Sequence, residues 1–82
     1  MIDVTLYGRP GCHLCDEARA EIVGLIGPRS EIELREVDID ADESLLRRYL
    51  ERIPVVEVQG VTVSELSFDR DAFARAVHTV GP

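Results

Sequence analysis

The sequence predicts an α/β fold in which three helices flank one four-stranded mixed sheet. In short segments apolar residues alternate with polar ones, and in longer segments they recur every three to four residues. Glycines and prolines separate the two kinds of segment, and the order along the chain is β-α-β-α-β-β-α. Strands joined through a helix are expected to be parallel and strands joined by a short turn antiparallel, so the sheet is mixed.

The first strand is predicted at residues 2–7, where apolar residues occupy every second position. Residues 8–11, Gly-Arg-Pro-Gly, end this strand. A helix is expected from residue 12 to the Gly-Pro pair at 27–28, because an apolar stripe recurs there at helical spacing. The stripe consists of Leu14, Ala18, Ile22 and Leu25, flanked by Cys15 and Ile26.

The second strand is predicted at residues 32–39, although its alternation shifts by one position between Leu34 and Val37. The shift indicates either a β-bulge or a strand that is covered on both faces. Asp40 and Glu43 have the spacing of a capping box, so a second helix is expected to begin there and to stop at Pro54. Its apolar face comprises Leu45, Leu46, Tyr49, Leu50 and Ile53.

Residues 55–58 and 61–63, separated by Gln59 and Gly60, predict a tight hairpin. A last helix follows, which either Ser67 or Asp69 caps and which Gly81 ends. Its apolar residues lie at positions i, i+3, i+4 and i+7: Phe73, Ala76, Val77 and Val80.

Length and charge restrict the function. We expect residues 1–82 to form a single domain, because the chain is short and contains neither a repeat nor a linker. Nine arginines and sixteen acidic residues give a net charge of −7, which argues against nucleic acids and anionic membranes as partners. The sequence contains no apolar run of membrane-spanning length and no basic flank of a signal peptide, so we expect a cytoplasmic monomer.

Cys12 and Cys15 stand where the loop after the first strand enters the first helix. The free backbone N–H groups at the start of a helix favour a thiolate, which is the attacking species in disulfide exchange. We therefore predict that Cys12 is the nucleophile and that Cys15, on the apolar stripe, is the less exposed resolving thiol. Arg9 and a protonated His13 would favour the Cys12 thiolate, while the acidic residues at 16 and 17 would oppose it.

Two other uses of the cysteine pair are open. The pair could bind zinc or an iron–sulfur cluster across a dimer, since two cysteines and the poorly aimed His13 leave the ligand set of one chain incomplete. The pair could also be redox-inactive in an adaptor protein. A metal site within one chain is not expected.

Several residues resemble the glutaredoxin-like branch of the thioredoxin-fold proteins: Tyr7, the segment 9–15 from Arg9 to Cys15, and Ile53-Pro54 before a valine-rich hairpin. The resemblance covers nearly the whole chain and implies a thioredoxin-like fold with a thiol-disulfide oxidoreductase activity. It places a cis-proline at Pro54 and implies that Arg9, His13, Ile53 and Pro54 contact the substrate. It further implies that no cofactor is bound and that glutathione, as an external thiol, or a thioredoxin reductase supplies electrons for reducing protein or small-molecule disulfides.

The sequence departs from this family pattern at the residues that select the substrate. His13 and Leu14 stand between the cysteines, where many glutaredoxins have Pro-Tyr. The Gly-Gly and Asp segment with which glutaredoxins bind the carboxylates of glutathione is replaced by residues 63–69, which lack Gly-Gly. Glu65 would repel those carboxylates, so the sequence argues against easy capture of glutathione.

Overall fold

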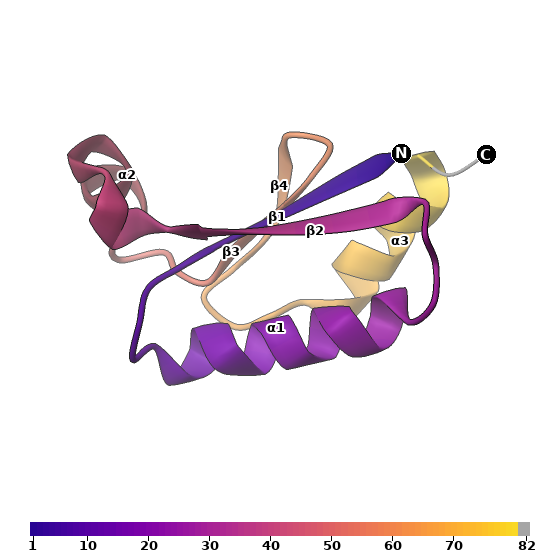
Figure 1. Ribbon diagram of the computed structural model, residues 1–82, viewed down its shortest axis with the longest axis horizontal. Helices are drawn as coiled ribbons and strands as arrows, with labels where there is room; N and C mark the ends of the chain where they lie inside the picture. The colour runs from indigo at the N-terminus through magenta and orange to yellow at the C-terminus, as the bar shows by residue number, and fades with distance from the viewer. Residues whose placement is uncertain (81–82) are drawn as a thin grey trace.

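Figure 1 shows the computed structural model, which describes residues 1–80. The elements follow the predicted order, with one short 3₁₀ helix inserted before the second α-helix. They are β1 (Ile2–Gly8), α1 (His13–Ile26), β2 (Ile32–Asp38), η1 (Ile39–Ala41), α2 (Glu43–Tyr49), β3 (Val55–Val58), β4 (Val61–Glu65) and α3 (Arg70–Val80). The predicted fold class, a four-stranded mixed sheet with three α-helices, is confirmed.

The strand order in the sheet is β2-β1-β3-β4. β1 pairs with β2 in parallel, whereas β1–β3 and β3–β4 are antiparallel. Tyr7 near the end of β1 pairs with Val55 at the start of β3, and Val55 pairs with Glu65 at the end of β4. The end of β1, the start of β3 and the end of β4 therefore meet at one edge of the sheet, where the β1–α1 loop begins.

The helices cover the two faces of the sheet unequally (Figure 1). α1 and α3 pack on one face and enclose the larger core, whose buried residues are Ile2, Val4, Leu6, Ala18, Ile22, Ile32, Val56, Val58, Phe73 and Val77. α2 covers the other face near the edge of the sheet where β1 ends, and it encloses a smaller core made of Ile39, Tyr49 and Val55. Burial of these apolar side chains supplies the main driving force for folding.

The shifted alternation in β2 comes from coverage of both faces. The parallel register from Ile2–Ile32 to Gly8–Asp38 is continuous, so the alternative of a bulge was wrong. Ile32 and Leu34 pack into the larger core, while Val37 lies beside Tyr7, whose face α2 covers.

The apolar face of α1 differs from the predicted stripe by one position at its start. Cys15, Ala18 and Ile22 are its buried residues, whereas Leu14 is 50% exposed. Both sets have helical spacing, so the sequence alone could not separate them. Leu50, expected on the apolar face of the second helix, is also exposed and lies directly after the end of α2 at Tyr49.

The predicted N-cap of the second helix was wrong. η1 occupies residues 39–41 and buries Ile39 completely, which moves the start of α2 beyond Asp40. Asp42 is the N-cap instead, and its carboxylate accepts the backbone N–H groups of Ser44 at 2.8 Å and Leu45 at 3.3 Å. Hydrogen bonds from Ser44 and Leu45 lower the pKa of Asp42 below its ordinary value.

The hairpin turns at Gln59 and Gly60 as predicted, but β4 continues to Glu65. The register of β3 and β4 shifts between Val56 and Glu57, which allows this longer strand. Of the two candidate caps of the last helix, Asp69 accepts the Ala72 N–H at 3.0 Å. The predicted helix end at Gly81 and the side chain of Val80 lie outside what the structure describes.

Candidate active site

The β1–α1 loop turns the chain from the sheet edge into a helix. The Cys12 N–H donates to the Arg9 carbonyl at 3.2 Å, across Pro10 and Gly11. Proline followed by a residue with positive φ, here +80° at Gly11, is the pattern of a type II turn. The turn delivers Cys12 to the N-cap position of α1.

Cys12 and Cys15 form a disulfide with their Cα atoms 5.2 Å apart. The Cys12 sulfur also accepts the backbone N–H of Cys15 at 3.1 Å, so a sulfur atom performs the capping that an oxygen performs in most helices. Cys12 is half-buried, whereas Cys15 is only 6% exposed. An incoming group can therefore reach Cys12 more readily than Cys15, as the sequence predicted.

Gly8 makes room for the Cys15 sulfur. A Cβ atom built at Gly8 would lie 3.0 Å from Cys15 Sγ and 3.1 Å from Cys15 Cβ, which is closer than carbon and sulfur atoms normally approach. In the sequence Gly8 is recognisable only as part of the segment that ends the first strand. Its contact with Cys15 depends on how α1 packs against β1, so the sequence alone carried no signal of this role.

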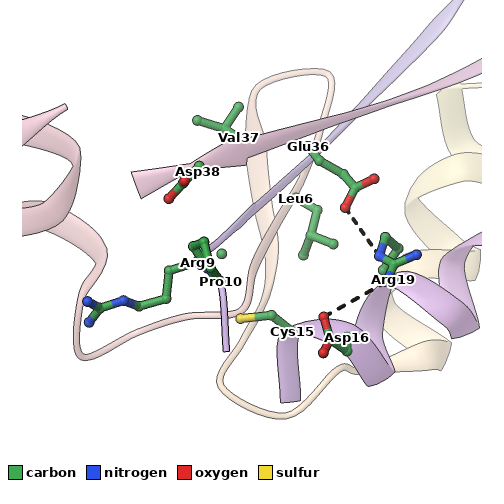
Figure 2. A pocket seen from close by; sticks show the side chains of 10 residues that line it. Leu6, Arg9, Pro10, Cys15, Asp16, Arg19, Glu36, Val37 and Asp38 are labelled. Carbon is green, nitrogen blue, oxygen red and sulfur yellow. Dashed lines mark ion pairs between the residues drawn. The ribbon is translucent and has the colours of Figure 1, made fainter. Parts of the chain in front are cut away.

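A hollow of about 370 Å³ opens beside Cys15 between α1 and β2. Figure 2 shows the side chains that line it: Leu6, Arg9, Pro10, Cys15, Asp16, Arg19, Glu36, Val37 and Asp38. The Arg19 guanidinium lies 3.3 Å from the Glu36 carboxylate and 3.9 Å from that of Asp16. The Arg19–Glu36 pair ties α1 to β2 across the hollow, while the Arg19–Asp16 pair lies within α1.

The two basic residues close to the cysteines in the sequence, Arg9 and His13, each form an ion pair with a carboxylate. Arg9 lies 3.2 Å from Asp40 in η1, and Figure 2 shows its guanidinium extending away from Cys15. The His13 side chain is 86% exposed, and its Nε2 lies 2.8 Å from the Glu17 carboxylate. Each basic group therefore has a carboxylate partner of its own.

Ile53 and Pro54 approach the site edge from β3. The Ile53–Pro54 peptide bond is cis, as the family resemblance implied, and the Pro54 side chain is fully buried. The Ile53 N–H donates to the Tyr49 carbonyl at 3.0 Å, and its side chain packs on the smaller core. Because Val55 pairs with Tyr7, Pro54 lies at the edge where the cysteine loop starts.

Glu65, which the sequence analysis treated as a repelling charge, is paired. The Arg52 guanidinium donates a hydrogen bond to the Glu65 carboxylate and lies 5.2 Å above the Tyr49 ring. This hydrogen bond raises the pKa of Arg52 and lowers the pKa of Glu65. This pairing could not be inferred from the sequence, since thirteen positions separate the two residues.

Beside these partners, Glu57 accepts long hydrogen bonds of 3.4 Å from the hydroxyls of Tyr7 and Tyr49, whose rings stack at 4.4 Å. Burial, followed by the nearby charge of Glu57, raises the pKa of Tyr7.

Within residues 1–80, no three His, Cys, Asp or Glu side chains gather as a metal ion would require. No helix in the same part of the chain is long and apolar enough to cross a membrane.

The fold and the cysteine geometry together define a thioredoxin-fold protein with a Cys-x-x-Cys pair able to form a disulfide. The family model of the glutaredoxin-like domain (DUF836) matches residues 3–78, and the chain belongs to this family. The resemblance drawn from the sequence is thereby confirmed. No curated protein matches the sequence.

Solved structures support this assignment. A protein of Nitrosomonas europaea, determined by NMR in solution, is 33% identical, with a TM-score of 0.76 over 90% of this chain and 88% of its own. A structural-genomics target protein of X. campestris is 30% identical, with a TM-score of 0.68 over 96% and 99% of the two chains. The oxidised thioredoxin of Plasmodium falciparum shares the fold at 13% identity, with a TM-score of 0.66 over 99% and 82%.

Proposed function

We propose that the protein is a thiol-disulfide oxidoreductase that reduces disulfides of proteins or small molecules. The observation that carries the proposal is the cysteine pair at the amino end of α1, which is disulfide-bonded, with Cys12 half-buried and Cys15 buried. One reachable sulfur and one protected sulfur, three residues apart, suit a two-step exchange.

In the first step the Cys12 thiolate attacks one sulfur of the substrate disulfide. A bond forms between Cys12 and that sulfur, and the other substrate sulfur leaves as a thiolate that takes a proton from solvent. In the second step Cys15 loses its proton to solvent and attacks the Cys12 sulfur, which closes the Cys12–Cys15 bond and releases the second substrate thiol. The protein dithiol supplies both electrons.

The start of α1 is the main support of the Cys12 thiolate in this proposal. The Cys15 N–H that now reaches the Cys12 sulfur at 3.1 Å would donate to the thiolate of the reduced form. Arg9 and His13 contribute less than the sequence suggested, because each faces a carboxylate. Backbone groups of Ile53 and Pro54 would guide the substrate chain at the sheet edge.

The protein needs an external source of electrons, for which we propose glutathione or a thioredoxin reductase, with no cofactor bound to the chain. A cytoplasmic location would suit this role, because thiols are kept reduced there. The partners would then be a substrate with a disulfide and a reductant, and the protein would work as a monomer.

The test compares wild type with Cys12→Ser and Cys15→Ser in the turnover of 2-hydroxyethyl disulfide, recycled by glutathione or by a thioredoxin reductase. We expect Cys12→Ser to be inactive and Cys15→Ser to accumulate a mixed disulfide on Cys12, detectable by mass spectrometry. A reduced wild type that does not react with the disulfide at all would overturn the proposal. Stoichiometric zinc or iron in a purified dimer would instead favour the metal-binding alternative.

A further inference from the structure

We propose that Leu66 is a specificity residue that binds an apolar side chain of a protein substrate next to the disulfide being reduced. This inference rests on the proposed oxidoreductase function and names its substrate class. The substrate would be an extended protein segment that carries an aliphatic or aromatic side chain beside its cysteine.

The backbone at Leu66 adopts a conformation that leucine disfavours. Its φ is +66°, in the left-handed region where the Cβ atom approaches the following carbonyl oxygen. Among the described non-glycine residues only Gln59 shares a positive φ, and there the two-residue hairpin turn requires it. Leu66 belongs to no such turn, and an unfavourable backbone conformation of this kind points to a functional constraint.

The leucine side chain does not compensate for this conformation by packing. Leu66 is 53% exposed, so about half of its surface stays in contact with water. A glycine would fit the same backbone without steric cost. The fold therefore does not account for a leucine at this position.

The loop around Leu66 is nevertheless held firmly. The Leu66 N–H donates to the Arg52 carbonyl at 2.9 Å. The buried Ser64 hydroxyl donates to the Ser67 carbonyl at 3.1 Å and accepts the Asp69 N–H at 2.8 Å. Because the backbone of this loop is already ordered, the loop loses little further freedom when a substrate binds, which favours affinity.

The sheet register places this loop beside the active site. Tyr7, Val55 and Glu65 lie in one row across β1, β3 and β4, whose neighbouring strands are about 4.8 Å apart. Leu66 directly follows this row on β4, just as the cysteine loop follows it on β1. Leu14, between the two cysteines, is 50% exposed and offers a second apolar side chain where α1 begins.

The charges here favour an apolar segment over an anionic small thiol. The guanidinium of Arg52, whose carbonyl holds Leu66, is engaged by the carboxylate of Glu65. An anionic ligand would have to compete with Glu65 for that guanidinium, in a protein whose net charge is −7. An uncharged apolar side chain meets no such opposition.

The test uses pre-reduced protein in single-turnover reactions with two synthetic peptides and 2-hydroxyethyl disulfide. Each peptide carries one cysteine in a mixed disulfide with thionitrobenzoate, and the peptides differ only in having leucine or serine beside that cysteine. Cys12 attacks the peptide sulfur and releases coloured thionitrobenzoate, after which Cys15 closes the disulfide and frees the peptide thiol. The release of colour gives the rate constant.

We expect wild type to prefer the leucine peptide. Leu66→Asn keeps a residue that tolerates positive φ but removes the apolar surface, and should slow the leucine peptide about tenfold, the factor for losing burial of roughly two methylene groups. Its rates with the serine peptide and 2-hydroxyethyl disulfide should stay within about twofold of wild type. Val61→Thr, at the opposite end of β4 and 64% exposed in wild type, is the matched control and should change none of the three rates.

Leu66→Gly separates recognition from folding. It suits the backbone, so its thermal midpoint should equal or exceed that of wild type while the preference for the leucine peptide is lost. Equal rates of wild type with both peptides, or an unchanged preference in Leu66→Asn, would overturn the role of Leu66 and leave the oxidoreductase function intact. If wild type reacted with none of the three disulfides, the proposed function itself would fail.

Discussion

The close approach of the Cys15 sulfur to position 8 links the end of β1 to the cysteine pair. Because a Cβ at position 8 would lie 3.0 Å from Cys15 Sγ, Gly8→Ala must displace either the strand or the sulfur. Overpacking of this kind costs about 1–3 kcal/mol, so we expect a lower thermal midpoint for the oxidised protein. Differential scanning calorimetry would measure the change.

The matched control for this substitution is Gly24→Ala on α1, where an added Cβ meets nothing within 4 Å. Because alanine is the better helix former, this variant should be about as stable as wild type or up to roughly 1 kcal/mol more stable. If Gly8→Ala had the same thermal midpoint as Gly24→Ala, the proposed packing of Cys15 against β1 would be incorrect.

At the scale of single residues, the sequence predicted the exposure of the two cysteines better than the contacts of their charged neighbours. The N-cap position of Cys12 and the helical stripe that contains Cys15 are local features, so their different exposure could be inferred. The partner of Arg9 could not, because Asp40 reaches it through the tertiary fold. The same holds for Glu65, whose charge appeared unpaired until the loop containing Arg52 was placed.

Capping of α2 by Asp42 makes the stability of this helix dependent on pH. Hydrogen bonds from Ser44 and Leu45 lower the pKa of Asp42 in the folded state relative to the unfolded chain. The contribution of this carboxylate is therefore fully present above the ordinary pKa of aspartate and is lost as the pH falls through the lowered value. Protonation in acid should weaken the cap.

Asp42→Asn tests this dependence, since asparagine caps helices about as well but does not titrate. We expect its urea midpoint to fall less steeply than that of wild type between about pH 5 and about pH 2. Asp40→Asn is the comparison variant, because Asp40 lies in η1 and does not cap α2. Parallel pH profiles for wild type and Asp42→Asn would contradict the assigned cap.

Elements with one strong local sequence pattern were predicted well. Elements whose bounds or burial depend on packing against other parts of the fold were not. The hairpin turn at Gln59 and Gly60 followed from its two residues alone. The start of α2 did not, because the burial of Ile39 inserted a 3₁₀ turn ahead of it. β2 left two explanations open, and only the placement of helices on both faces of the sheet decided between them.

The whole molecule carries a net negative charge, whereas the basic side chains near the cysteine loop are paired with carboxylates. Near the cysteine loop the basic groups of Arg9 and Arg52 are paired with acidic partners, so local charges largely cancel. The molecule as a whole carries a net charge of −7, and its field extends beyond the contacts of single residues. A charged disulfide should therefore interact with the field of the net negative charge during its approach, and with the paired side chains only at contact.

This distribution predicts a reaction rate that depends on substrate charge and salt. At low ionic strength the reduced protein should react faster with the dication cystamine and slower with the dianion dithiodipropionate, each by up to about tenfold relative to its own rate in high salt. The effect should fade as the screening length falls from about 10 Å at 0.1 M salt to about 3 Å at 1 M. The uncharged 2-hydroxyethyl disulfide is the reference, since its rate should not depend on salt. Because each disulfide is compared with itself at two salt concentrations, differences in leaving-group chemistry cancel. A salt-independent rate for cystamine would show that the field of the net charge has no effect on the reaction at the cysteines.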